Sequence, residues 1–306
     1  MDVVKKPKKK RNIKRALFII GTIAIPILHF CVFYIYVHAE AFVMAFQRYD
    51  VNGKLHWTLE NFEIVFKSFQ SGGIGLEALR NTMIYYLIAL LQTLIIGPLF
   101  AYFSYKNLWG DTLRRIVGAG AGLMSGVVVT TIVSLLFEPA GPISKLFTNI
   151  YNLDMPAQIF NDSRFALKGL IIYTVWWGLG INYYIRGAMM RIPEDVIEYA
   201  KLDGVSWVRE LTSIILPLCW PTIMTLLILS STSILMSSSQ EYLFTGGNYG
   251  TTTISHWLWV QQLNATPNSN SLYFVGALGM TLSFVTIPFV FGLRAILEKF
   301  NAKVEY

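Results

Sequence analysis

Six long apolar stretches, separated by polar segments of unequal length, dominate the pattern of this chain. They cover residues 16–37, 82–104, 116–137, 169–185, 218–239 and 271–292. Each is close to the roughly 17 to 25 residues that a helix needs to cross about 30 Å of hydrocarbon. Unpaired backbone groups are costly in lipid, and no segment shows the roughly ten-residue alternation of outer-membrane strands. We therefore expect an all-α, polytopic membrane protein with six transmembrane helices.

The composition agrees with this pattern. Apolar residues make up 54% of the chain and charged residues only 14%, whereas about a quarter of the residues in a soluble domain are charged. The first apolar stretch is longer than the roughly 7 to 15 residues of a secretory signal, so we expect it to remain as an anchor. The Lys-rich N-terminal tail directly precedes it, which favours contact with anionic membrane lipid over binding of nucleic acid.

Lys and Arg residues are distributed unequally between the two sides of the membrane. Eighteen of the 25 lie in the N-terminal tail, the 105–115 loop, the polar segment 186–217 and the C-terminal end. Because positive residues concentrate in cytoplasmic loops, we expect these four regions, including both termini, in the cytoplasm. The protein itself would lie in the plasma membrane or the bacterial inner membrane. The chain then divides into a tail 1–15, a first transmembrane helix 16–37, an external segment 38–81, a core of five transmembrane helices 82–296 and a tail 297–306.

The polar segment 186–217 is the strongest local signal in the chain. Pro193 fits a first helical position, and two acidic residues follow it at the positive end of the helix dipole. Asp203-Gly204 predicts a turn, after which Ser206 is a candidate cap for a second short helix that Pro217 ends or kinks. We expect a helix, a turn and a helix outside the membrane. An amphipathic connector lying on the bilayer surface fits the periodicity equally well.

Six residues of this segment follow a fixed spacing: Glu198, Ala200, Gly204, Ile214, Leu216 and Pro217. The spacing resembles the EAA loop of binding-protein-dependent ABC importer permeases. The Asp203 that precedes Gly204 resembles the residue at this position in the maltose-type sugar branch of that family. Tyr199 departs from the first Ala of the motif. A Thr-Gly-Gly segment at 245–252 and the residues 45–50 are also similar to sugar permeases. We refer to residues 186–217 as the EAA loop.

This resemblance implies the fold of a type I importer transmembrane subunit. ATP would be hydrolysed by two cytoplasmic ATP-binding cassette subunits docked on the EAA loops, and this chain would hold no cofactor and no catalytic site. Ile214, Leu216 and Pro217 would belong to the same coupling set as Glu198, Ala200, Asp203 and Gly204, which would transmit closure of the ATPases to the spans. A second homologous permease would supply the other half of the pore. It would be a different chain, as is usual in maltose-type systems, or another copy of this one. An extracytoplasmic binding protein would deliver the solute. The chain itself contains no P-loop motif.

Two spans carry hydroxyl, amide and aromatic groups that suit a sugar path. Our candidates are Trp176, Asn182, Tyr183, Ser233, Met236, Ser237 and Gln240. Ser230, Ser233, Ser237 and Gln240 recur every three or four residues, so they would share one helix face. The alternative is that the serines bond carbonyls of their own helix and that the aromatic residues only pack.

Apart from His29, the six spans contain no ionisable residue of the Asp, Glu, Lys, Arg or His types. Ion-coupled carriers usually keep an intramembrane carboxylate or relay, so a secondary carrier is the weaker hypothesis. A membrane enzyme would call for clustered His, Cys or carboxylates, and the four His residues are scattered. The resemblance favours a carbohydrate, above all an oligosaccharide, over glycerol phosphate or another small polar solute.

Overall fold

The computed structural model describes residues 13–106, 110, 112, 125–151, 159–235, 239–266 and 269–300. The elements up to the middle of the chain are α1 (Ile13–Phe30), the π-helical η1 (Cys31–Tyr36), α2 (Val37–Ala45), β1 (Gln47–Tyr49), β2 (Leu55–Trp57), α3 (Glu60–Ser68), α4 (Ile74–Leu91), the π-helical η2 (Gln92–Ile96), α5 (Gly97–Tyr105), α7 (Gly126–Phe137) and α8 (Pro142–Tyr151). Those that follow are α9 (Ala166–Trp177), the 3-10 turn η3 (Gly178–Gly180), α10 (Ile181–Met189), α11 (Glu194–Leu202), α12 (Trp207–Arg209), the π-helical η4 (Glu210–Ile215), α13 (Leu216–Thr232), α14 (Ser239–Thr245), α15 (Ile254–Leu263) and α16 (Ser271–Lys299). The predicted all-α fold is confirmed. In the described residues it is accompanied by one hairpin of two three-residue strands.

Five helical stretches of the described chain are long and apolar enough to cross a membrane. They are Phe18–Ala45, Ile74–Tyr105, Gly126–Ile150, Trp207–Thr232 and Ser271–Lys299. The remaining predicted span, 169–185, lies in the run α9, η3 and α10, where the 3-10 turn η3 interrupts the α-helix. The arrangement is therefore consistent with six spans, one of which is broken near its middle.

The helices do not end where the apolar pattern ends. α2 continues eight residues past position 37 to Ala45, and α4 begins at Ile74 rather than at position 82. The extra turns contain charged residues such as Glu40 and Glu77 yet remain helical, because glutamate forms helices well. The opposite error occurs in the fifth span: the prediction of a helix over 218–239 is wrong at its end, since α13 stops at Thr232.

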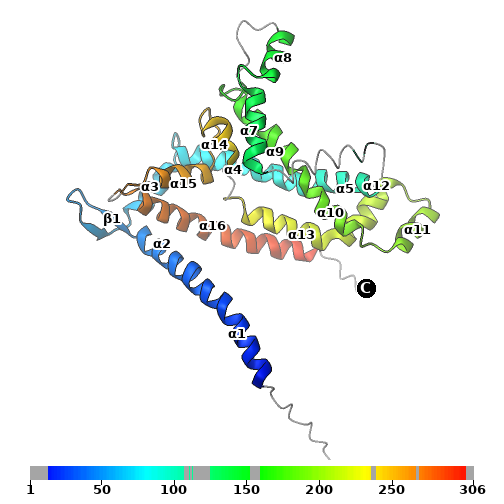
Figure 1. The fold of residues 1–306 in the computed structure, drawn as a ribbon, viewed down its shortest axis with the longest axis horizontal. Coiled ribbons are helices and arrows are strands. Elements are labelled where there is room, and N and C mark those ends of the chain that lie inside the picture. Colours follow the sequence, from blue (N-terminus) through cyan, green and yellow to red (C-terminus); the bar gives the residue numbers. More distant parts are fainter. Residues whose placement is uncertain are drawn as a thin grey trace, which may run out of the picture.

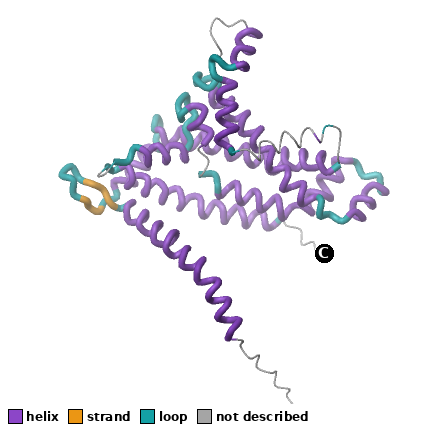
Figure 2. Tube along the Cα trace, in the orientation of Figure 1, coloured by secondary structure: helices purple, strands orange, loops and turns teal. Residues whose placement is uncertain are grey.

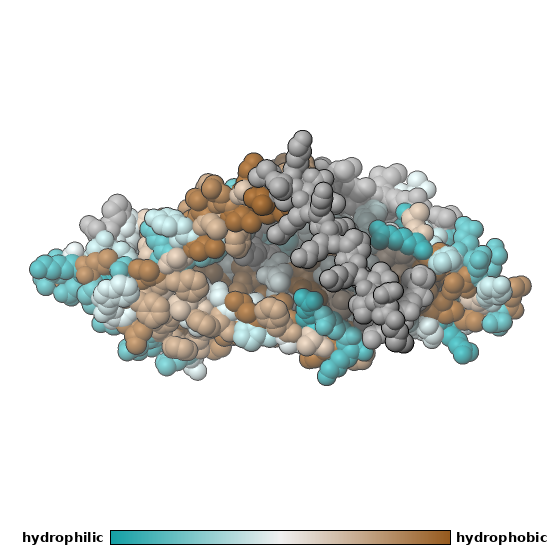
Figure 3. Space-filling view, turned by 90° about the horizontal axis from the view of Figure 1, so that it is seen from below, coloured by the Kyte–Doolittle hydropathy of each residue, from teal (hydrophilic) through white to brown (hydrophobic). Residues whose placement is uncertain are grey.

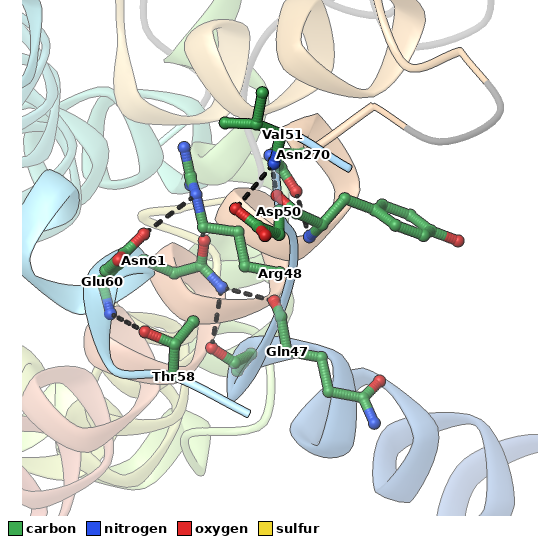
Figure 4. Close-up of polar contacts among 10 residues, drawn as sticks. Gln47, Arg48, Asp50, Val51, Thr58, Glu60, Asn61 and Asn270 are labelled. Carbon is green, nitrogen blue, oxygen red and sulfur yellow. Dashed lines mark hydrogen bonds and ion pairs between the residues drawn. The ribbon is translucent and has the colours of Figure 1, made fainter. Parts of the chain in front are cut away.

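A polar network fixes the β1–β2 hairpin to the start of α16 and to α3 (Figure 4). The strands pair antiparallel, with Arg48 opposite His56. The Arg48 guanidinium donates to the Asn61 side chain over 3.0 Å and pairs with Glu60 at 3.3 Å. Asn270, which caps α16, exchanges two hydrogen bonds with the backbone of Tyr49. This hairpin therefore marks the end of the molecule at which α16 begins.

The EAA loop lies at the other end of α16 (Figure 1). Leu297, in the last turn of that helix, belongs to a core cluster with Ile197 and Leu211 of the EAA loop. The Trp220 indole N–H also donates to the Leu297 carbonyl. A helix of 29 residues is about 43 Å long at 1.5 Å per residue. The hairpin and the EAA loop are thus separated by about the thickness of a membrane.

The first helix stands away from the rest of the bundle (Figure 2). In the most apolar part of Phe18–Ala45, none of the residues is buried within this chain. The end of α2 packs against α16, where Gly276 lies close to the backbone of Ala41 and Ala45 and where Ala45 is fully buried. Seen from below, hydrophobic residues gather on the part of the middle that is not drawn in grey, hydrophilic residues cover the left end, and the right end carries both kinds (Figure 3). This distribution fits a body that crosses a membrane along its long axis.

Candidate functional site

The first helix of the EAA loop, α11, ends in a Schellman motif. The N–H of Val205 donates to the Ala200 carbonyl, and the N–H of Gly204 donates to the Lys201 carbonyl, both over 3.1 Å. In this motif the residue after the cap adopts a left-handed conformation, and Gly204 has φ +66°. The predicted turn at Asp203-Gly204 is confirmed. Pro193 lies at the N-cap rather than at the first helical position, one residue earlier than predicted.

Gly204 is required for its backbone angle rather than for close packing within this chain. A Cβ added there would have no other atom within 4 Å. The left-handed region costs an L-residue roughly 1 to 2 kcal/mol, so glycine suits the position on conformation alone. The space in front of it is open in this chain.

The second helix of the EAA loop differs from the prediction. Ser206 occupies the N-cap of α12, but its side chain makes no capping hydrogen bond. Pro217 does not end the helix, because the run continues through the π-helical segment η4 into α13. A proline at the start of α13 is tolerated since the preceding wide turn already departs from α-helical hydrogen bonding. The EAA loop is thus continuous with the span Trp207–Thr232.

The EAA loop has two faces of different character. Its inner face packs on the core through buried residues, which are Ile192, Ile197, Ala200, Leu211 and Ile215. Its outer face exposes Glu198, Tyr199, Leu202, Asp203, Gly204 and Trp207. Ile214, Leu216 and Pro217 are half-buried where the loop joins α13. Of the predicted coupling residues, Ala200 therefore packs inwards, while Glu198, Asp203 and Gly204 face outwards.

A buried carboxylate links the EAA loop to α5, and the sequence alone did not reveal it. Lys106 Nζ lies 2.5 Å from Glu210 Oε1, and the Tyr102 hydroxyl donates to Glu210 Oε2 over 3.2 Å. Glu210 is 6% exposed. The partners are more than 100 positions apart in the chain, so no local motif indicates that they meet.

The predicted path residues of the fourth span lie around its break. Asn182 is buried and donates to the Leu179 carbonyl in the 3-10 turn, and Tyr183 is half-buried on the next position of α10. From the start of η2, the amide of the buried residue Gln92 donates to the carbonyls of Thr174 and Val175, over 3.2 and 2.8 Å. The Thr174 carbonyl also accepts from the backbone N–H of Gly178, so the amide adds a second donor at the end of α9. Gln92 therefore stabilises the break, a role that we did not predict for it.

α14 brings one further path candidate to the same helix. The Thr174 hydroxyl donates to the Gln240 side-chain oxygen over 2.9 Å. Trp176 packs against a cluster that includes Tyr173 of α9 and Phe244 of α14. The structure thus places Gln240 and Trp176 on neighbouring elements, α14 and α9.

The expected serine stripe is not one helix face. Because α13 stops at Thr232, Ser233 and Gln240 belong to different elements. The Ser233 hydroxyl donates to the carbonyls of Leu229 and Ser230, which is the alternative that the sequence left open. The predictions for Met236 and Ser237 lie outside the described residues.

Next to Gln240 stands a second buried carboxyl, Glu241, in α14 outside the five candidate spans. Its Oε2 has no hydrogen-bond partner among the described residues, and the same is true of the Tyr85 hydroxyl. Burial raises the pKa of Glu241 from its ordinary value to about 7. Burial also lowers the pKa of His256 in the neighbouring α15. Among the described side chains, no group of three or more His, Cys, Asp or Glu residues could hold a metal ion.

Apolar spans, a broken helix with polar support and a two-helix loop at one end define a transmembrane transport subunit. The family described as "Binding-protein-dependent transport system inner membrane component" matches residues 82–305. The chain belongs to this family, and the resemblance found in the EAA loop is confirmed.

Several relatives are sugar permeases. The multiple sugar-binding transport system permease protein MsmF of Streptococcus mutans is 24% identical over 252 residues, covering 80% of this chain and 85% of the relative. The arabinooligosaccharides transport system permease protein AraP of Bacillus subtilis is 24% identical over 277 residues, covering 85% and 82%. The maltose/maltodextrin permease MalF of Vibrio vulnificus matches 56% of this chain at 25% identity, but only 33% of its own length.

Solved structures share the fold. A bacterial ABC transporter involved in the import of the acidic polysaccharide alginate contains a chain with TM-score 0.77 and 19% identity, covering 94% of this chain and 97% of that one. A second structure, the alginate transporter with an alginate pentasaccharide-bound periplasmic protein, gives TM-score 0.74 and 21% identity. The fold of an ABC importer permease is therefore confirmed.

Proposed function

We propose that this chain is the transmembrane permease subunit of an ATP-driven importer for a carbohydrate, above all an oligosaccharide. It forms half of the translocation path and performs no bond chemistry. The observation that carries the proposal is the EAA loop, whose outer face presents apolar and acidic side chains beside an open glycine turn. Sugar permeases among the relatives support the cargo class.

The outer face of the EAA loop is the surface on which a cytoplasmic ATPase docks. Leu202 is 81% exposed, and Tyr199 and Trp207 of the same loop are also exposed. Apolar groups that cluster on a polar loop are typical of protein–protein contact sites. Glu198 and Asp203 flank them, and Gly204 leaves room for the partner. Closure of two ATPases would then move the EAA loop, and through it α13.

The solute path would run past the broken fourth span. Trp176, Asn182, Tyr183 and Gln240 supply aromatic and amide groups near the break, and the segment Ser233 to Ser237 with Met236 would complete the lining. Hydroxyl and amide groups that bond a sugar need carry no fixed charge. The absence of Lys and Arg from the predicted spans disfavours a phosphorylated cargo such as glycerol phosphate.

The remaining partners follow from the same scheme. A second, different permease would pair with this one, and an extracytoplasmic binding protein would deliver solute at the end of the molecule that carries the β1–β2 hairpin. The termini and the EAA loop would lie in the cytoplasm, as the distribution of Lys and Arg predicts.

Substitution of Gly204 tests the docking role. Asn tolerates the left-handed conformation and Val does not, so Gly204→Asn adds bulk with the turn kept, and Gly204→Val also strains the turn. We expect both to reduce co-purification of the ATPases and to lower solute-stimulated ATPase activity in proteoliposomes by about tenfold. Gly53 is the matched control, because it has φ +70° and open space at the opposite end of the molecule.

Gly53→Asn should leave assembly and stimulation unchanged. Normal docking and normal stimulation in both Gly204 variants would contradict the proposal. So would uptake that continues without ATP and collapses with an ion gradient, because that is the behaviour of a secondary carrier.

A further inference from the structure

The ion pair between Glu210 and Lys106 is the best-supported feature that the proposed function does not yet use. Only 8% of the Glu210 side chain and 22% of the Lys106 side chain are exposed. Lys106 Nζ also stands over the rings of Tyr102 and Tyr105, at 5.5 and 5.9 Å from their centroids. One carboxylate therefore forms an ion pair with an ammonium group through one oxygen and accepts a hydrogen bond from a phenol through the other. The ammonium group is flanked by two aromatic faces.

A buried ion pair of this kind calls for a reason other than stability. Removing two charges from water is costly, and replacement of such a pair by apolar residues is often neutral or stabilising. The best-attested use of buried polar pairs is to fix the register of packed elements. The chain offers a contrast in α16, where the exposed pair Arg294–Glu298 links two residues of one helix.

The location of the pair indicates which elements are held in register. Glu210 is the first residue of η4, in the second helix of the EAA loop, and Lys106 is the C-cap of α5. The rest of the contact between the EAA loop and the bundle includes a buried apolar cluster with Tyr102 and Leu297. Apolar packing is non-directional, so it holds the surfaces together without fixing how far one slides along the other. The ion pair supplies that constraint.

We propose that Glu210 and Lys106 form a latch that makes the EAA loop and the end of α5 move as one unit. The proposal rests on the coupling role of the EAA loop and adds a second route for the motion. Displacement of the EAA loop reaches α13 along the continuous helix, and it reaches α4 and α5 through this latch. Glu210 and Lys106 are positioning residues, because neither contacts solute nor nucleotide in this scheme.

The test measures solute transported per ATP hydrolysed in proteoliposomes that contain the complete transporter. Glu210→Gln and Lys106→Met each remove one charge, and the combination of both leaves a neutral pair with no orphaned charge. We expect complexes that still assemble but transport about tenfold less solute per ATP. The exchange Glu210→Lys with Lys106→Glu should restore most of the lost ratio. Glu298→Gln, in the exposed pair of α16, is the matched control and should behave as the wild type.

Three results would overturn the latch. One is a wild-type transport ratio in the assembled neutral double variant. Another is a loss of uptake that only follows the loss of assembled complex, since a purely structural role would change the amount of complex and not the ratio. A third is a reversed pair that remains as uncoupled as the single variants. Failure of the wild-type chain to bind an ATPase would instead contradict the proposed function.

Discussion

At the scale of single residues, Glu241 is a buried ionisable side chain whose hydrogen bonding is incomplete. It is 2% exposed, and one of its oxygens has no partner among the described residues. Its burial favours the neutral acid, which is why the pKa rises to about 7. The titratable residues on its own helix and on α9 and α15, which pack against it, are Tyr242, Lys168, Tyr173 and His256, and Tyr85 of α4 also interacts with it. Protonation of this carboxyl is therefore linked to folding.

The pH dependence of stability follows from the sign of that shift. An acid whose folded pKa is raised contributes stability that is fully present below its unfolded pKa of 4.5 and is lost as the pH rises through about 7. Its contribution to the free energy of unfolding should be roughly 3 kcal/mol smaller at pH 8 than at pH 4. Thermal unfolding in detergent of the wild type and of Glu241→Gln, compared over this range, measures the difference.

The wild type and the Glu241→Gln variant must be compared because His256 changes the free energy of unfolding with pH in the opposite direction. Its pKa is lowered by burial, so its contribution is present above the unfolded value and is lost as the pH falls. Glu241→Gln leaves His256 in place and removes only the carboxyl. Equal pH profiles for the two proteins would contradict the assignment to Glu241.

At the scale of elements, the interruptions in the helices are the informative features. The π-helical segments η2 and η4 each begin with a buried polar residue that bonds to another element, Gln92 in one case and Glu210 in the other. The 3-10 turn η3 is the structure that Gln92 supports. Wide turns of this kind are often found at functional sites. In this chain η2 lies next to the proposed path, and η4 contains the proposed coupling contact.

Gly178 provides a test of the contact at η3. A Cβ at this position would lie 2.1 Å from the Gln92 amide nitrogen. Gly178→Ala should displace that amide and remove its two hydrogen bonds to α9, at a cost of about 1 to 3 kcal/mol in the free energy of unfolding. The same change in a Gln92→Ala background should cost much less, because the obstacle is already gone. Denaturant unfolding of the four proteins completes the cycle.

Gly187 is the matched control for that cycle. It lies in the adjoining α10, and an added Cβ would meet nothing within 4 Å. Gly187→Ala should be neutral or stabilising, since alanine is the better helix former. Additive costs of Gly178→Ala and Gln92→Ala would contradict direct contact.

Local chemistry determined which elements the sequence could predict. The turn at Gly204 was predictable because a helix, an Asp-Gly pair and a second helix follow one another in the chain. The end of α13 at Thr232 was not predictable, since serines and threonines neither form nor forbid a membrane helix. The contacts of Gln92, Gln240 and Glu210 join segments that are distant in the chain, and a pattern within one segment does not predict such contacts.

At the scale of the whole molecule, the two ends of α16 give the chain a clear polarity. One end carries the β1–β2 hairpin and the other carries the EAA loop. Val51 is 100% exposed at the first end, and Leu202 is the corresponding exposed residue at the second. If the EAA loop is cytoplasmic, these two positions face opposite aqueous compartments.

Labelling of introduced cysteines measures that polarity directly. In a background with Cys31 and Cys219 replaced by serine, Val51→Cys should react with a membrane-impermeant maleimide on intact cells that lack an outer barrier. Leu202→Cys should react only after permeabilisation. Reaction of Leu202→Cys on intact cells would reverse the topology and remove the basis of the ATPase-docking proposal.

The solitary first helix has a consequence for how this protein responds to the bilayer. In the most apolar part of Phe18–Ala45 no residue is buried by the remainder of the chain, and lipid tails are as apolar as these side chains. The stretch of 28 residues is longer than the roughly 20 that cross the hydrocarbon core. A thinner or thicker bilayer would therefore be met by a change in the tilt of this helix, while the packed bundle keeps its shape.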